Sequence, residues 1–248
     1  MIYAVCNQKG GVGKSTTAAA LWAGLNRAGH KSLVIDLDPQ CNLTFTTAAD
    51  TNHRSALGLL TGEADPLDTI QPTEEGDVIA GSKALVGADN FITATGKEYR
   101  LREALEPIKA RYDHIVIDCP PALGILTVNA LTAATHVIIP CQADIFSLQG
   151  VQQLSQTIEP VRKYCNPGLV IEGLLLTRYN ARTALSRDLT TSAESLAAKL
   201  GTKVFKTAIR EATAIKEAQI SQRSIFDYAP KANVTADYTA FLHEVIGE

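Results

Sequence analysis

The stretch QKGGVGKST, residues 8–16, decides the fold of this chain. It follows a short apolar run at 2–6 that predicts a buried strand, and it precedes an alanine- and leucine-rich run at 17–27 that predicts a helix. A glycine loop between a strand and a helix is the arrangement that binds phosphate. Glycines let successive N–H groups turn toward an anion, and the positive end of the helix dipole points at the same place.

Individual side chains of this loop strengthen the prediction. Lys14 is placed to reach the outer phosphates of a nucleotide, and the Ser15 hydroxyl suits Mg²⁺. The alternative is a glycine turn without a ligand, which the joint presence of loop, lysine, hydroxyl and flanking elements disfavours. One departure is visible, because the general pattern has glycine where this chain has Gln8. The residues that this pattern leads us to expect at the nucleotide are Gly10, Gly11, Val12, Gly13, Lys14, Ser15 and Thr16.

Three aspartates stand at the ends of predicted strands. The run 32–36 ends in Asp36, Asp38 follows after one residue, and the β-branched run 115–117 leads into Asp118. The carboxyl ends of parallel strands share one edge of a sheet, so these acids are expected near the loop. Asp118 fits the position of a Walker B acid, which binds Mg²⁺ directly or through its waters. Strand-end acids exposed to solvent are the alternative, against which the glycine loop argues.

The predicted strands and helices alternate along the chain, without repeats or a low-complexity linker. This order predicts an α/β fold, with one domain over residues 1–248 and a mostly parallel, doubly wound sheet that has helices on both faces. Apolar residues make up 46% of the chain and charged residues 20%, which suits a globular domain with a substantial core. Pro107 is expected to kink or end the helix in which it falls. Further strands are predicted at 77–80, 136–141, 169–177 and 203–206, and helices at 55–60, 66–71, 98–111, 126–134, 145–164, 186–200 and 234–246.

Composition disfavours several classes of protein. No apolar run approaches the ~20 residues that a membrane helix needs, and no basic segment precedes an apolar one at the start. We therefore expect a cytoplasmic protein without a membrane span. The net charge of −3 gives no general attraction to nucleic acid. None of the five cysteines forms a C-x-x-C pair, so small buried side chains are expected rather than a metal site.

The second lysine of the loop, Lys9, has no role in a plain phosphate loop. The residues KGGVGKS at 9–15, with D-x-D-P-Q-x-N at 36–42 and the strand ending in Asp118, resemble the ParA/MinD family of P-loop ATPases. The similarity spans nearly the whole chain and is weakest at 46–96. It implies that ATP and Mg²⁺ bind, and that each Lys9 of a homodimer crosses the interface to the other copy's nucleotide. A solvated loop charge is the alternative for Lys9.

The resemblance also implies roles for the acidic residues. Asp38 would orient and activate the attacking water. Arg178 stands where the family places residues near the adenine, and it is a further candidate for nucleotide binding. The catalytic residues implied are Lys9, Lys14 and Asp38, and the metal ligands implied are Ser15, Asp36 and Asp118.

The function implied is that of an ATP-dependent switch for plasmid or chromosome partition. ATP hydrolysis would be slow and stimulated by a ParB-like adaptor, and the ATP-bound dimer would hold nucleoid DNA without reading its sequence. Where the resemblance leads us to expect arginines, the chain has Ala197, Ala198 and Ala214. Scattered surface charge is therefore an open alternative for the nearby cations. The cations available for DNA are Lys199, Lys203, Lys206, Arg210, Lys216 and Arg223.

Other functions compete with this one. The missing arginines favour a related ATPase that positions a protein or a cellular structure through a protein partner, without DNA. A nitrogenase-like iron protein would need cluster cysteines, and Cys119 has no suitable second cysteine. A MinD-like membrane cycle is disfavoured, because the end of the chain, 241–248, has no lysine or arginine beside its apolar residues.

Overall fold

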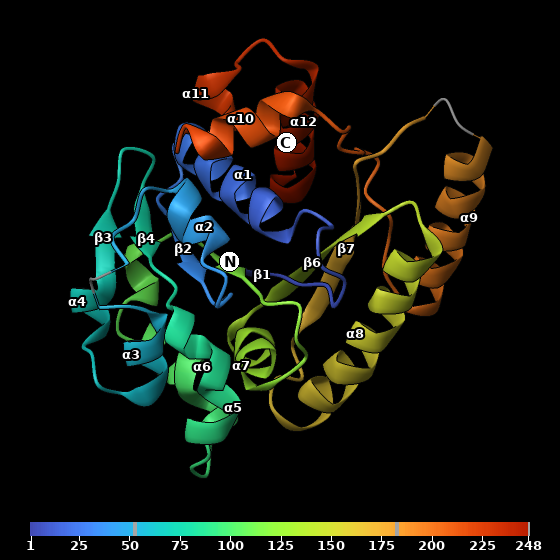
Figure 1. The fold of residues 1–248 in the computed structure, drawn as a ribbon. Coiled ribbons are helices and arrows are strands. Elements are labelled where there is room, and N and C mark those ends of the chain that lie inside the picture. The colour runs from blue at the N-terminus through green and yellow to red at the C-terminus, as the bar shows by residue number, and fades with distance from the viewer. Residues whose placement is uncertain (52–53, 182–183, 248) are drawn as a thin grey trace.

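A seven-stranded sheet runs through the computed structural model, which describes residues 1–51, 54–181 and 184–247 (Figure 1). The strands lie in the order β3-β4-β2-β5-β1-β6-β7 across the sheet. Neighbouring strands pair in parallel except β3, which runs antiparallel to β4 at one edge. The mostly parallel sheet predicted from the sequence is therefore confirmed. The strands are β1 (Ile2–Val5), β2 (Ser32–Asp36), β3 (Ile70–Pro72), β4 (Asp77–Ile79), β5 (His114–Asp118), β6 (His136–Gln142) and β7 (Val170–Thr177).

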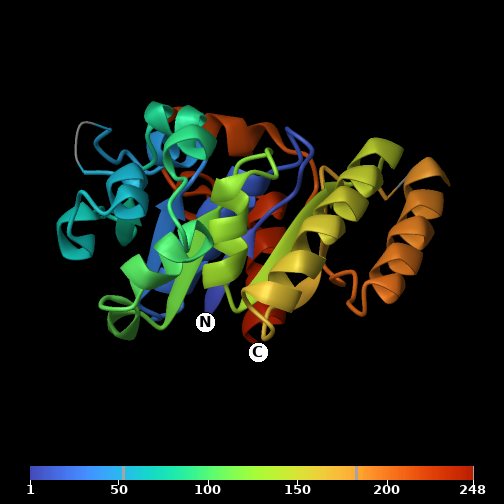
Figure 2. The same cartoon turned by 90° about the horizontal axis from the view of Figure 1, so that it is seen from below.

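Helices cover both faces of the sheet, as Figures 1 and 2 show. One face carries α1 (Lys14–Arg27), α10 (Thr213–Ile220), α11 (Ile225–Tyr228) and α12 (Asn233–Ile246). The other face carries α3 (Ala56–Thr61), α6 (Arg100–Leu105), α7 (Ile125–Ala133), α8 (Ile145–Tyr164) and, beside β7, α9 (Ala184–Lys199). The connections contain α2 (Asn42–Thr46), α4 (Pro66–Thr69) and α5 (Ala88–Phe91). Within the described residues, no helix is both long and apolar enough to cross a membrane.

Side chains of each central strand alternate between two apolar cores. In β5, Ile115 and Ile117 belong to the core under α6, α7 and α8, whereas Val116 belongs to the core under α1 and α12. In β6, Val137 and Ile138 divide in the same way. Because helices cover both faces, the interior positions of these strands are apolar on both sides, which is typical of parallel sheets. This continuous hydrophobicity is the pattern from which the strands were predicted.

Two helices end earlier than predicted. The helix predicted at 98–111 is shorter in the structure, because α6 ends at Leu105 and only short 3₁₀ turns flank it. Pro107 lacks the N–H that a continuing helix needs, so the expected break is confirmed. The helix predicted at 66–71 ends at Thr69, and the chain then enters β3.

Other predicted elements differ from the structure. The strand predicted at 203–206 is wrong, because only Val204 forms an isolated bridge, with Leu174 of β7. A single bridge does not extend the sheet. The helix predicted at 17–27 begins earlier, at Lys14, inside the glycine loop. The short helices α2 and α10 were not predicted, because neither presents a long apolar stripe.

An aromatic cluster lies at the amino ends of the strands, opposite the glycine loop. Tyr3 stacks on His114 with ring centroids 5.8 Å apart, and His30 meets His114 edge-on at 5.0 Å. Burial lowers the pKa of His114 to about 4, and the Met1 ammonium and His30 act in the same direction against Asp113. His114 is therefore neutral in the folded protein at pH 7.

His114→Gln should reduce the loss of stability in acid. The unfolded chain protonates this histidine near pH 6.5, whereas folded His114 takes up the proton only near pH 4. Wild-type stability should thus fall as the pH drops through this window, by about 1–2 kcal/mol because the ring is only partly buried. Urea midpoints at pH 7 and pH 5 should differ less for His114→Gln than for wild type. The exposed His243→Gln is the control, and an unchanged difference in His114→Gln would contradict the assignment.

Candidate nucleotide site

The predicted phosphate loop joins β1 to α1, and two of its glycines adopt conformations that need glycine. Gly11 and Gly13 have φ of +77° and +86°, in the left-handed region that strains other residues. α1 begins directly after Gly13, and no side chain caps its first N–H groups. These N–H groups remain available to an anion at the positive end of the helix.

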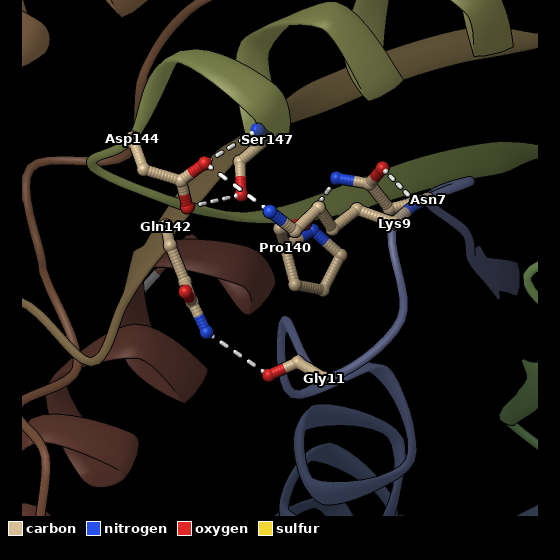
Figure 3. A network of polar contacts seen from close by, with 7 residues as sticks. All are labelled: Asn7, Lys9, Gly11, Pro140, Gln142, Asp144 and Ser147. Atoms are coloured by element: carbon tan, nitrogen blue, oxygen red, sulfur yellow. Dashed lines mark hydrogen bonds and ion pairs between the residues drawn. The ribbon is translucent and has the colours of Figure 1, made fainter.

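Neighbouring strands hold the backbone of this loop (Figure 3). Gln142 at the end of β6 donates to the carbonyl of Gly11 at 3.0 Å, and Thr177 at the end of β7 donates to the carbonyl of Val12 at 2.8 Å. Asn7 donates to a β6 carbonyl at 2.7 Å. The loop is therefore shaped by the sheet before any ligand binds.

A cleft of about 520 Å³ opens beside the loop. Its walls bring together the loop, the segment of Asp38 and Pro121 after β5, which the sequence predicted to meet at this edge. Lys14 is only 6% exposed, and its ammonium donates to the carbonyl of Lys9 at 3.1 Å. This contact holds the Lys14 ammonium against the loop, while the residue itself lines the cleft.

Asp36 is buried and saturated with hydrogen bonds. One carboxylate oxygen accepts the N–H of Asp38 at 2.9 Å, and the other accepts the N–H and hydroxyl of Thr44 at 2.9 and 2.7 Å. The Thr44 hydroxyl in turn accepts the N–H of Gly81. Burial raises the pKa of Asp36 to about 6, although these hydrogen bonds favour the charged form. The carboxyl group thus fixes the turn that carries Asp38 and the start of α2.

Asp118 lies next to Asp36 on the neighbouring strand, and its environment is the opposite. It is fully buried, and among the residues that the structure describes neither of its oxygens has a hydrogen-bond partner. Burial raises the pKa of Asp118 well above its usual range, and Asp36 adds to this, while the nearby Ser15 hydroxyl and Lys14 oppose it. A buried carboxylate without donors is a site that a cation would stabilise. The pair of Asp118 and Ser15 therefore fits Mg²⁺.

Asp38 lines the cleft from a turn with an unusual backbone. Its carboxylate accepts the N–H of Gln40 at 3.0 Å, and the side chain is 5% exposed. Cys41, which follows, has φ of +55°, a left-handed conformation that costs energy in a residue other than glycine. The turn places Asp38 at the wall of the cleft, where a water molecule beside the outer phosphates would lie.

Lys9 is held within its own chain (Figure 3). Its ammonium lies 3.4 Å from a carboxylate oxygen of Asp144 and 5.0 Å from the centre of the Phe146 ring. The same carboxylate caps α8 by accepting the N–H and the hydroxyl of Ser147, each at 2.8 Å. Burial disfavours the charged form of Asp144, but Ser147 and Lys9 outweigh it and lower the pKa of the carboxyl group.

Arg178 lies beside the loop, at the end of β7. It forms an ion pair with Glu211 and has φ of +51°. The two residues line a side pocket of about 150 Å³ together with Gly13 and the apolar Ile209 and Ile215. The structure thus places Arg178 in a pocket that borders the phosphate loop, and its place near the adenine stays a prediction.

A further hollow of about 620 Å³ lies on the other side of α10. It is separated from the cleft by the hydrogen bond that Gln219 donates to Thr16 at 3.0 Å. Its walls include Ala19, Ala23 and Glu75, but none of residues 8–15. It is therefore not the phosphate site.

Comparisons with known proteins agree with this geometry. A family model described as an AAA domain matches residues 1–171. Soj, the sporulation initiation inhibitor protein of Bacillus subtilis, is 39% identical over 249 residues, which cover 98% of this chain and 97% of Soj. The chromosome partitioning protein ParA of Caulobacter vibrioides is 40% identical over 252 residues, covering 99% of this chain and 93% of that protein. The chain belongs to the ParA/MinD family of ATPases.

Solved structures share the ParA/MinD fold with this chain. Cobyrinic acid a,c-diamide synthase of Mycobacterium smegmatis, solved with ADP and magnesium, has a TM-score of 0.84 at 34% identity. The match covers 100% of this chain and 96% of that structure. Apo McdA of Cyanothece has a TM-score of 0.88 at 21% identity and covers 99% of both chains, which shows the common fold alone.

Several residues of this ParA/MinD-type site were missed from the sequence. Asp144 and Ser147 form a helix N-cap three residues apart, a signal that could have been recognised. Thr44 carries no such signal, because its hydroxyl acquires a role only when the chain folds back on Asp36. Lys216 of α10 also lines the cleft, although the sequence suggested only a DNA contact for it.

Thr44→Val should destabilise the protein by about 2–3 kcal/mol, because a buried carboxylate loses a hydroxyl donor and Gly81 loses its acceptor. The isosteric valine leaves the backbone hydrogen bond from residue 44 in place. Thr46→Val in the same helix is the control, since its hydroxyl bonds only the exposed carbonyl of Asn42. Urea unfolding at pH 7 measures both variants. Equal free energies of unfolding would show that the Thr44 hydroxyl does not stabilise Asp36.

Proposed function

We propose that this chain is an ATP-dependent dimerising switch for plasmid or chromosome partition, and that residues 1–248 act as one cytoplasmic ATPase domain. Similarity to Soj and ParA over nearly the full chain supports the choice within the family. The observation that carries the proposal is the loop with two lysines, Lys14 buried in the wall of the cleft and Lys9 held by Asp144 outside that wall. Lys14 would serve the nucleotide of its own subunit, and Lys9 that of a second copy.

The residues present fit Mg²⁺ and ATP. The Ser15 hydroxyl and the Asp118 carboxylate would hold the metal, directly or through its waters, and a bound Mg²⁺ would neutralise charge on the outer phosphates. Asp36 was expected in the same shell, but its oxygens are occupied by Asp38 and Thr44. We therefore assign Asp36 the role of fixing Asp38. The side pocket beside Arg178 would take the base.

A water molecule positioned by Asp38 would attack the γ-phosphate and break its bond to the β-phosphate. Its carboxylate lies in the cleft wall, as an acid that orients the attacking water must. Hydrolysis would be slow until an adaptor protein of the ParB type completes the arrangement. Release of the γ-phosphate would then remove the charge that attracts the partner's Lys9.

The contact between Lys9 and Asp144 does not prevent a role across the interface. Both side chains are 33% exposed, and such ion pairs stabilise by about 0–1 kcal/mol. A lysine facing a triphosphate in a water-excluded interface gains more, as with arginine fingers. Lys9 would therefore leave Asp144 when a second subunit presents its nucleotide.

Exposed apolar side chains lie in two groups, one at the cleft and one beside Lys9, and they support a partner there. Phe45 and Ile220 line one side of the cleft and are 56% and 76% exposed. Ile145 and Phe146, at the start of α8 next to Lys9, are 60% and 64% exposed. Large apolar side chains grouped around a charged cleft are typical of interaction surfaces. A second copy of this chain would cover both groups.

DNA binding is the least supported part of this function. Ala197, at one of the expected arginine positions, is 1% exposed in the core, so that position faces away from any ligand. Among the candidate cations, Lys203 pairs with Glu172 and Arg210 is held by Asp237. Both cations are half-exposed, but their carboxylates are more buried. Asp237 binds Arg210 through both of its oxygens, so this pair is the harder one to exchange for a phosphate contact. In the alternative function, the same ATPase would position a protein or a cellular structure through a protein partner.

Lys9→Ala should bind Mg·ATP but fail to form ATP-dependent dimers. The variant keeps the loop backbone and Lys14, so nucleotide affinity should change less than threefold by calorimetry. Light scattering should show wild type near twice the monomer mass with ATP and Lys9→Ala near the monomer mass. Lys231→Ala, an exposed lysine away from the cleft, is the control and should dimerise. If Lys9→Ala formed as many dimers as wild type, the proposed contact of Lys9 with the other subunit's nucleotide would be contradicted.

Gel shifts on a duplex of arbitrary sequence separate the two candidate functions. For a partition switch, the ATP state should bind at micromolar concentration and the ADP state much more weakly. Affinity should fall with salt at a slope of about −0.9 for each phosphate contacted. No shift with ATP, from protein that demonstrably dimerises, would favour the alternative in which the partner is a protein.

A further inference from the structure

The helix α10 is anchored over the phosphate loop by two hydrogen bonds. Gln219 donates to the hydroxyl of Thr16 at 3.0 Å, immediately beyond the loop lysine and serine. Gln222, just after α10, donates to the carbonyl of Phe45 at 2.9 Å in α2. Ala218, just before Gln219, is buried in the core under α1. The position of α10 relative to the nucleotide site is therefore set by contacts to both flanking helices.

One face of α10 forms a wall of the cleft. Lys216, Gln219 and Ile220 are spaced by three and four residues, which places them on the same side of the helix, and all three line the cleft with Lys14 and Asp38. Lys216 also lines the side pocket. It is the only residue of α10 besides Gln219 that borders both spaces. Lys216 thus lies where the phosphate cleft meets the pocket beside Arg178.

The charges around Lys216 leave its ammonium available. Glu211 faces it from the loop after β7, but Glu211 is bonded to Arg178. The Arg178 hydrogen bond lowers the pKa of Glu211 most, and Lys216 adds only a weaker through-space effect. Lys216 itself is exposed and is the second lysine, after Lys14, in the wall of the cleft.

We propose that Lys216 binds the polyphosphate of the nucleotide from α10, within its own subunit, and is a nucleotide residue rather than part of a DNA surface. The proposal rests on the proposed ATPase function and adds a binding residue to it. Lys14 would meet the phosphates from the loop side and Lys216 from the opposite wall. A cation in the cleft wall attracts a multiply charged anion more strongly than one on an open surface.

Lys216→Gln should weaken Mg·ATP binding about fivefold to tenfold at low salt, and Mg·ADP binding less, because fewer phosphate charges face the residue. Lys216→Arg keeps the charge and should retain most of the affinity. Calorimetry from 50 to 300 mM salt measures all three proteins. The loss in Lys216→Gln should shrink as salt rises, because an exposed charge contact is screened.

The matched control is Lys199→Gln, the same charge change at an exposed position in the last turn of α9, which borders neither the cleft nor the side pocket. It should leave nucleotide affinity unchanged. Thermal melting checks that each variant is folded; Lys216 is exposed, so little change is expected.

Different outcomes would contradict the role of Lys216 and the ATPase function on which it rests. If wild type binds no Mg·ATP, the proposed ATPase function fails. If wild type binds and Lys216→Gln binds ATP equally well, the inference about Lys216 fails alone. A loss that is independent of salt would also overturn it, since that would indicate a neutral contact to base or sugar. A variant with intact nucleotide affinity but lost duplex binding would assign Lys216 to DNA.

Discussion

The nucleotide edge of this protein depends on how two carboxylates are kept inside the sheet. Asp36 and Asp118 are paired in register on β2 and β5, and neither side chain is exposed. Burial disfavours the charged form of both and raises both pKa values, and Asp36 adds to the shift of Asp118. Asp36 is stabilised by Thr44 and by the backbone, whereas Asp118 has no hydrogen-bond partner among the described residues. This asymmetry distinguishes Asp36, which holds the surrounding chain, from Asp118, which a cation would stabilise.

The phosphate loop shows a similar division between fixed and movable parts. Its backbone is held by the ends of β6 and β7 and needs no ligand to adopt its shape. Its two lysines, in contrast, rest on contacts that are easily exchanged. Lys14 bonds a loop carbonyl, and Lys9 bonds the exposed Asp144. The loop backbone is thus organised before the nucleotide binds, while the lysine side chains can change partners when it arrives.

The helix α10 brings a third part of the chain to this site. It touches the start of α1 through Thr16 and α2 through Phe45, so it contacts both segments that follow the loop and Asp38. A nucleotide that shifts either segment would therefore also shift α10. The same helix ends at Ile220, whose side chain is 76% exposed beside the cleft mouth. The proposed nucleotide contact and the proposed surface for a second copy are therefore joined in one short helix.

The sequence by itself determined most of the strands and longer helices, the glycine loop and the three strand-end acids. Continuous apolar runs, glycines before a helix and acids after a strand are local patterns that neighbouring residues create. Only the tertiary structure decided which partners these groups have. Lys9 meets Asp144 across 135 residues, and Thr16 meets Gln219 across 203. Such contacts arise when the sheet brings distant segments to one edge, so no local pattern near Lys9 or Thr16 records them.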